Sequence, residues 1–382
     1  MLAGRPPNSQ PDAGVTNMPA IKTDWHLSAP ISPTNAKADT PLFPFLARLI
    51  RGENLNAAEA TAFFTAMIDA SANPAQVAGA LTALTAKGET FEELAGMASV
   101  MRKAAVRVNV PQKLAIDISG TGSSAVKTFN VSTAAAFVAA GAGLSVAKQC
   151  NRGVSSLSGS GDVLAELGVK VANEPGVAQA SLGTGLCFIF APKFHPALNR
   201  VGGIRGGLGI RTCLNVLGLL ANPASVSRQL TGVWHRSLVE PVAGALALLK
   251  TEYAWVVHGS DGLDEVTLTG KTFVSSVKDG KVLSYVVTPA DFGLKAASID
   301  HLKTDSAKAS ASIIRDVLAS RRRDEARSLI VLNAAAALVV GGIAKDPMHA
   351  ARLAEQSIDS GQAQNKLERL IQVTNKKVGS RQ

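Results

Sequence analysis

A stretch of small and polar residues at positions 120–133 has the composition of a loop that binds an anion. It begins with Gly120-Thr121-Gly122, follows a short apolar run at 114–119, and precedes a helical pattern at 133–142. Small residues let backbone N–H groups approach a phosphate, and a helix N-terminus adds partial positive charge. The stretch matches neither the P-loop nor the dinucleotide fingerprint. A tight turn capped by Ser and Thr is the alternative interpretation.

A second polar loop follows the next predicted strand, at residues 144–148. It contains Lys148 and Arg152 and continues through the Ser/Gly segment 155–162. Two cations and several hydroxyls suit phosphate oxygens, although a solvated surface loop has the same composition. Ligands of open α/β sheets bind at the carboxyl ends of the strands. Because two such loops each follow a strand, we favour a shared anionic ligand.

Two further segments carry charges that suit a phosphorylated ligand. Residues 200–211 contain three arginines and five glycines, and Arg205 in the middle could reach a carboxylate or phosphate. A mobile basic loop is an equally good interpretation. After a predicted strand at 254–258, the acidic segment 261–265 offers hard oxygen ligands for Mg²⁺. On spacing alone, an ordinary acidic turn is more common.

No spacing indicates a catalytic triad or a Cys/His pair. We expect His195 and His258 to be structural, and Arg321-Arg322-Arg323 to lie on a solvated helix face. The cysteines at 150, 187 and 213 form no metal-binding pattern or disulfide framework, which favours a reducing, cytoplasmic compartment.

Composition limits the class of protein. The chain has 382 residues, 46% hydrophobic and 18% charged, so it can bury a large core and its length favours two domains. The formal charge of +10 suits a phosphorylated small molecule, a nucleic acid or a membrane surface. No apolar run is long enough to span a bilayer, and the longest, at 330–343, is typical of a buried helix.

The pattern along the chain predicts three parts. Residues 1–40 are rich in Pro, Asn, Ser and Thr and are predicted to be a flexible leader. Residues 41–107 are predicted to form a helical N-terminal domain, which some helices from about 195–235 are expected to join. Residues 108–382 alternate strands and helices, which predicts a larger α/β domain with a central mixed sheet. An Asp279-Gly280 turn predicts a hairpin in it.

The helical part has clear start signals. Asn56 is predicted to cap one helix, and Thr90 with Glu93 to form the capping box of another. Gly52 is predicted to end the first helix.

The motifs occur in an order that resembles the anthranilate phosphoribosyltransferase family, within the wider group that includes pyrimidine-nucleoside phosphorylases. The resemblance runs from about residue 46 to near the C-terminus. The matching motifs lie at residues 51–53, 73–77, 87–96, 117–122, 128–134, 151–152, 190–196, 208–212, 215–218, 222–223, 257–265 and 288–294.

The resemblance implies a small helical domain beside a larger α/β domain, of the glycosyltransferase family 3 type and usually in a homodimer. It implies transfer of phosphoribosyl from 5-phosphoribosyl 1-pyrophosphate (PRPP) to an aromatic amine such as anthranilate, in tryptophan biosynthesis. It also implies Mg²⁺, a cytoplasmic location and no membrane association.

The resemblance also implies roles for individual residues, none of them a nucleophile or a base. PRPP would be bound by Gly120, Thr121, Gly122, Thr128, Asn130, Ser132, Thr133 and Lys148. Asn151 and Arg205 would face the aromatic acceptor, with Arg205 on its carboxylate. The ligands of Mg²⁺ would be Ser132, Ser160, Asp264 and Glu265.

The chain departs from the family pattern at the ligand loops. Ser123-Ser124-Ala125 replaces Gly-Asp-Gly, Gln149 replaces a His, Leu157 replaces a Lys, and Gly206-Gly207 replaces Arg/Lys-Glu. One alternative is therefore a paralogue with a different acceptor. Another is a non-catalytic member that binds a nucleic acid or another anion, although the basic residues are dispersed and aromatics are few.

Overall fold

The computed structural model describes residues 40–110, 115–122, 124, 126–153 and 159–376. The predicted leader lies outside these residues, apart from Thr40. Residues 40–382 form one compact unit. Within the described residues, no helix has both the length and the apolar character needed to cross a bilayer.

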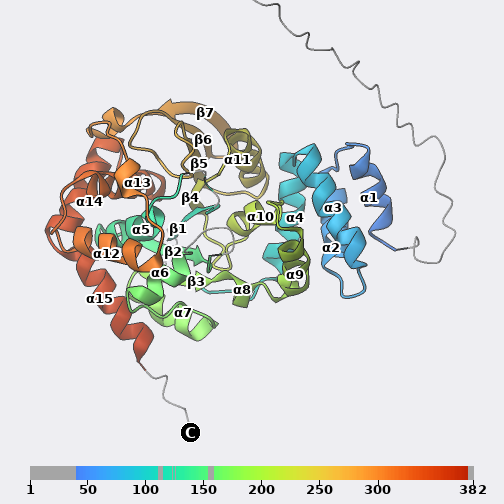
Figure 1. The fold of residues 1–382 in the computed structure, drawn as a ribbon, viewed down its shortest axis with the longest axis horizontal. Helices are drawn as coiled ribbons and strands as arrows, with labels where there is room; N and C mark the ends of the chain where they lie inside the picture. The colour runs from blue at the N-terminus through green and yellow to red at the C-terminus, as the bar shows by residue number, and fades with distance from the viewer. Residues whose placement is uncertain (1–39, 111–114, 123, 125, 154–158, 377–382) are drawn as a thin grey trace, which may run out of the picture. The chain divides into compact units, whose positions relative to one another are not determined.

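Four helices form the N-terminal part of this unit (Figure 1). They are α1 (Phe43–Ile50), α2 (Ala57–Ile68), α3 (Pro74–Lys87) and α4 (Phe91–Ala104). The predicted caps are confirmed: the Asn56 side chain accepts from Ala58 N and Glu59 N, and Thr90 and Glu93 form a capping box. Gly52, at φ +76°, follows the end of α1, as predicted.

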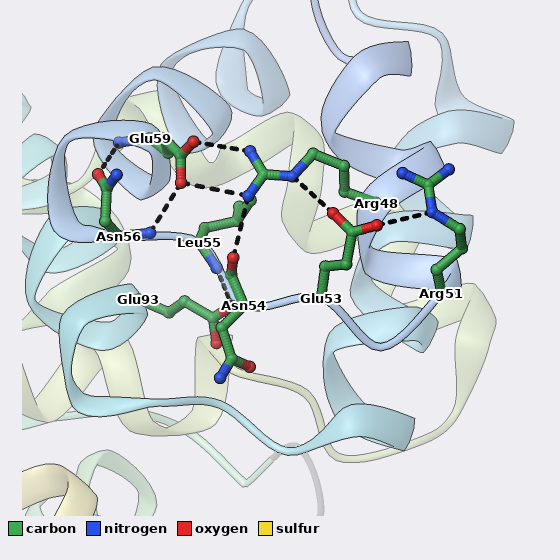
Figure 2. Close-up of polar contacts among 8 residues, drawn as sticks. All are labelled: Arg48, Arg51, Glu53, Asn54, Leu55, Asn56, Glu59 and Glu93. Carbon is green, nitrogen blue, oxygen red and sulfur yellow. Dashed lines mark hydrogen bonds and ion pairs between the residues drawn. The ribbon is translucent and has the colours of Figure 1, made fainter.

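Polar side chains hold the linker between α1 and α2 (Figure 2). Arg48 donates to Glu53 at 3.1 Å and to Glu59 at 2.7 Å, and the buried carboxylate of Glu93 accepts from Leu55 N at 3.0 Å. Partly exposed ion pairs contribute little to stability. The buried hydrogen bond to Leu55 is therefore the stronger constraint on the linker.

A seven-stranded sheet forms the centre of the larger part, in the order β3-β2-β1-β4-β5-β6-β7. The strands are β1 (Ala115–Gly120), β2 (Ser145–Cys150), β3 (Leu186–Phe190), β4 (Arg228–Gly232), β5 (Tyr253–Gly259), β6 (Thr272–Lys278) and β7 (Lys281–Val287). The first five in that order pair in parallel, and β6 and β7 are antiparallel. The predicted mixed sheet and the Asp279-Gly280 hairpin are confirmed.

Eleven more helices are described in this part. They are α5 (Val131–Gly141), α6 (Ser160–Glu166), α7 (Pro175–Leu182), α8 (Ala191–Phe194), α9 (Asn199–Leu208), α10 (Leu214–Leu220), α11 (Val239–Leu248), α12 (Ala307–Leu318), α13 (Glu325–Gly341), α14 (Pro347–Asp359) and α15 (Gln362–Asn375). The buried helix predicted near 330–343 is α13, most of whose side chains are buried.

Helices cover both faces of the sheet (Figure 1). Trp255 and Val257 of β5 belong to the core shared with α5 and α13, whereas Ala254 and Val256 belong to the core shared with α4, α10 and α11. This alternation follows from the two-residue period of a strand. Helices α9, α10 and α11 also pack against the N-terminal helices α3 and α4.

Two regions differ from the sequence interpretation. The glycine-rich segment around Arg205 is a helix, α9, and not a loop; its C-terminal residue is followed by Gly209 in the left-handed conformation. Arg321-Arg322-Arg323 lies in the connection between α12 and α13, not on a helix face. The three arginines form ion pairs, in this order, with Asp316 at 2.7 Å, Asp324 at 2.6 Å and Asp359 at 3.5 Å.

Candidate active site

A cavity of about 240 Å³ opens at the carboxyl ends of β1 and β2. Parallel strands end at the same edge of the sheet, so the loops that follow them meet there. The predicted site residues that line it are Gly120, Thr121, Gly122, Thr128, Asn130, Ser132, Lys148, Asn151, Ser160, Arg205, Asp264 and Glu265. The structure therefore gathers into one cavity residues that are far apart in the sequence.

Thr133 does not belong to this set. Its side chain is fully buried in α5, and its hydroxyl has no hydrogen-bond partner among the described residues. Because α5 is covered by the sheet and by α13 and α15, only its first residues reach the cavity. The structure therefore places Thr133 outside the residues that line the cavity, and its contact with PRPP stays a prediction.

Asp264 is held by the loop that follows β1. Its Oδ2 accepts from Thr121 Oγ1 at 2.9 Å and from Gly122 N at 2.8 Å. The backbone of Asp264 also lies directly against Gly232 at the end of β4, where a Cβ would be 1.7 Å from the Asp264 carbonyl oxygen. The acidic loop can therefore reach this position only because residue 232 has no side chain.

Glu265 faces the N-terminus of α5, where its Oε1 accepts from Ser132 N at 3.1 Å. Burial, with the adjacent charge of Asp264, raises the pKa of Glu265 to about 8. Two neighbouring carboxylates and the adjacent Ser132 form a set of hard oxygen donors. Such a set fits Mg²⁺, since a cation would relieve the repulsion between the carboxylates.

Lys148 places a buried amino group close to these carboxylates. Its side chain is 3% exposed, and its Nζ donates to Ile118 O and lies 3.3 Å from Ser132 Oγ. Burial lowers the pKa of Lys148, and the negative charges of Asp117 and Glu265 oppose this effect. An ammonium group in this position can neutralise an anionic ligand.

Asp117, which we did not predict as a site residue, supports this wall of the cavity. It is buried and accepts from Ser119 Oγ at 2.5 Å and from Asn222 Nδ2 at 2.7 Å. Asn222 also donates to Ala147 O at 2.8 Å. This network fixes the ends of β1 and β2, on which Ser119 and Lys148 stand.

A second side of the cavity is formed by α9 and α10. Arg205 lines it, and partial burial lowers the pKa of its guanidinium. Gln149 also lines it, and its Nε2 donates to Gly218 O at 2.6 Å. The residue that replaces the family His therefore connects β2 to the end of α10.

Of the remaining predicted or altered positions, Ser124 lines the cavity. Neither His195 nor His258 lines the cavity; the Nδ1 of His258 lies 2.8 Å from Val233 O. Residues 123, 125 and 157 are outside the described residues. Lys127 and Asn215 also line the cavity. Neither was predicted as a site residue, although Lys127 lies within the polar stretch at 120–133 and Asn215 within the motif at 215–218.

Comparisons with known proteins agree along the chain. The model of the "Glycosyl transferase family, a/b domain" matches residues 112–364, and that of the "Glycosyl transferase family, helical bundle domain" matches residues 43–105.

Two similar proteins are the anthranilate phosphoribosyltransferases of Rhodopseudomonas palustris (strain BisB18) and Anaeromyxobacter dehalogenans (strain 2CP-1). They are 45% and 47% identical, over 86% of this chain and 97% of their own lengths.

Two solved structures are also similar. That of anthranilate phosphoribosyltransferase from Thermus thermophilus has a TM-score of 0.81 at 35% identity, covering 86% of this chain and 98% of that one. That of the Saccharomyces cerevisiae protein in complex with PRPP and Mg has a TM-score of 0.79 at 27% identity, covering 88% and 98%.

Proposed function

This chain belongs to the anthranilate phosphoribosyltransferase family of glycosyl transferases, and we propose that its cavity transfers 5-phosphoribosyl from PRPP to anthranilate. The observation that carries the proposal is the meeting of Lys148, Asp264 and Glu265 around the glycine-rich loop after β1. This arrangement suits a ligand that carries a phosphate and a pyrophosphate.

The reaction explains why a strong nucleophile is not needed. The amine nitrogen of the acceptor forms a bond to C1 of the ribose while the C1–O bond breaks. Pyrophosphate leaves with the electron pair, and the amine loses a proton. The protein must neutralise the leaving group and hold the amine close to C1. We assign the first task to Lys148, and the second to Asn151 and Arg205.

We propose that Ser132, Ser160, Asp264 and Glu265 hold Mg²⁺. The oxygen donors at the cavity wall and the raised pKa of Glu265 support this assignment. When bound, Mg²⁺ supplies positive charge to the pyrophosphate. From the same family membership, we propose that the protein is a cytoplasmic homodimer and that it serves tryptophan biosynthesis.

The proposed function is tested by calorimetric titration of the full chain with PRPP, with and without Mg²⁺. We expect binding that requires Mg²⁺, followed by the appearance of product when anthranilate is added. Absence of PRPP binding in both conditions would overturn the proposal. Binding without product from anthranilate would favour a paralogue with a different acceptor.

We predict that Arg205→Ala raises the KM for anthranilate by about 10-fold or more, because the charge-assisted hydrogen bond between Arg205 and the carboxylate of anthranilate is lost. The KM for PRPP is expected to stay within about twofold. Steady-state kinetics with each substrate varied in turn measure both values.

Arg200→Ala is the matched control. Arg200 lies on the same helix, but it donates to Asp69 O and Ala72 O and does not line the cavity. This variant is expected to leave both KM values unchanged. An equal loss of PRPP affinity in Arg205→Ala would contradict the role that we assign to Arg205.

A further inference from the structure

Ser310 of α12 contacts Asn130, which immediately precedes α5 at the edge of the cavity. The two residues are 180 positions apart in the sequence, and Ser310 is fully buried. Asn130 N donates to Ser310 Oγ at 2.9 Å, and Ser310 Oγ donates to Asn130 Oδ1 at 3.0 Å. One hydroxyl thus contacts both the backbone and the side chain of Asn130.

This exchange favours one orientation of the Asn130 amide, because a rotated amide would leave the buried hydroxyl of Ser310 without the acceptor that it has in the structure. A serine hydroxyl has one hydrogen to donate, and here it goes to the amide oxygen. The amide nitrogen has no hydrogen-bond partner among the described residues, and Asn130 lines the cavity. Ionised phosphate oxygens accept hydrogen bonds and donate none. The observed orientation therefore leaves the amide nitrogen of Asn130 available to donate to a phosphorylated ligand, whereas a rotated amide would leave an oxygen available instead.

The same part of the chain also holds the backbone next to Asn130. Lys303 forms a β-bridge with Thr128, and Phe129 N donates to Leu302 O at 3.3 Å. Residues 302–310 thus hold three consecutive residues of the cavity wall. The hydroxyl of Ser310 is the contact that reaches the amide side chain.

We propose that Ser310 is a positioning residue for PRPP: it holds the Asn130 amide with its nitrogen toward the phosphates. The inference rests on the proposed function, because it needs PRPP in this cavity. It adds to the site a residue from the C-terminal helices that never touches the substrate.

A double-mutant cycle with Ser310→Ala and Asn130→Ala tests the proposal, with the dissociation constant of PRPP measured calorimetrically in Mg²⁺. We expect Ser310→Ala to raise this constant about 10-fold, with the KM for anthranilate within about twofold, because one well-oriented donor is lost. In the Asn130→Ala background, the same substitution is expected to have a clearly smaller effect, since only the contact of Ser310 with the backbone N–H of residue 130 is left to lose. An equal effect in both backgrounds, or none in the wild-type background, overturns the inference.

Ser357→Ala is the matched control. Ser357 is also a buried serine, and its Oγ donates to Val138 O on the same helix α5, away from the cavity. It is expected to lower the stability in urea without changing the PRPP dissociation constant. A rise equal to that of Ser310→Ala would show that general loosening of α5 is the cause, and would overturn the inference.

Two further results keep the test decisive. If Ser310→Ala does not fold, Ser310→Cys fills the site with a slightly larger side chain that is only a weak donor, and it is expected to raise the dissociation constant at least about threefold. An unchanged constant in a folded Ser310→Cys protein overturns the inference. A wild-type protein that binds no PRPP would instead overturn the proposed function itself.

Discussion

Replacing Glu265 with glutamine is expected to lower kcat/KM for PRPP by roughly 10²–10³-fold, the usual effect of removing one group that stabilises the charge of a transition state. Glutamine has the same length and can still accept from Ser132 N through its Oε1, so the backbone contact at the start of α5 is preserved. What is lost is one of two negative charges proposed to hold Mg²⁺. The apparent affinity for Mg²⁺ is therefore expected to fall as well.

Steady-state kinetics with PRPP varied measure kcat/KM. A titration of activity with Mg²⁺, combined with metal binding followed through the electron paramagnetic resonance of Mn²⁺, measures the metal affinity. Glu252→Gln is the control, since Glu252 lies at the other end of β5 and pairs with Arg228. That variant should retain both activity and metal binding. Normal Mn²⁺ affinity in Glu265→Gln would rule out the ligand role of Glu265.

Local signals in the sequence predicted much of the fold. The caps at Asn56 and Thr90 and the Asp279-Gly280 hairpin depend on neighbouring residues only, and all three are confirmed. Strand β4 was not predicted, although it lies between β1 and β5. Its Gln229 and Thr231 are polar residues in buried positions, and Gln229 donates to Leu219 O at 2.8 Å. The contact with Leu219 explains why a polar residue can be buried in β4. Such a tertiary contact cannot be recognised in the sequence.

The candidate site, too, could be predicted from the sequence only in part. The two polar loops could be placed near each other because each follows a parallel strand. Contacts between distant segments could not be predicted, such as Thr121 with Asp264, 143 positions apart, or Asn130 with Ser310. Arg205 was identified by charge, but its place on a helix was not, since the glycines at 202, 203, 206 and 207 of α9 disfavour helix.

Gly232→Ala should disrupt the acidic loop more directly than any substitution within it. The new Cβ would be 1.7 Å from the carbonyl oxygen of Asp264, whereas real Cβ atoms are not found closer than 3.0 Å. Because the obstacle is backbone, the loop must move by more than an ångström, and Asp264 and Glu265 must move with it. We expect activity to fall by about 10²-fold, as for other misplacements of this size. The free energy of unfolding should fall by about 1–3 kcal/mol.

Gly176→Ala separates this steric effect from the general effect of replacing a glycine. Gly176 lies in α7, and a Cβ there would meet nothing within 4 Å. That variant is expected to be stabilised by about 0.5–1 kcal/mol, since alanine favours helix, with unchanged activity. Urea unfolding and Mn²⁺ binding measure the two effects independently. If Gly232→Ala bound Mn²⁺ as tightly as wild type, the carboxylates would not depend on the close contact between β4 and the Asp264 backbone, and the position of the metal site would need another explanation.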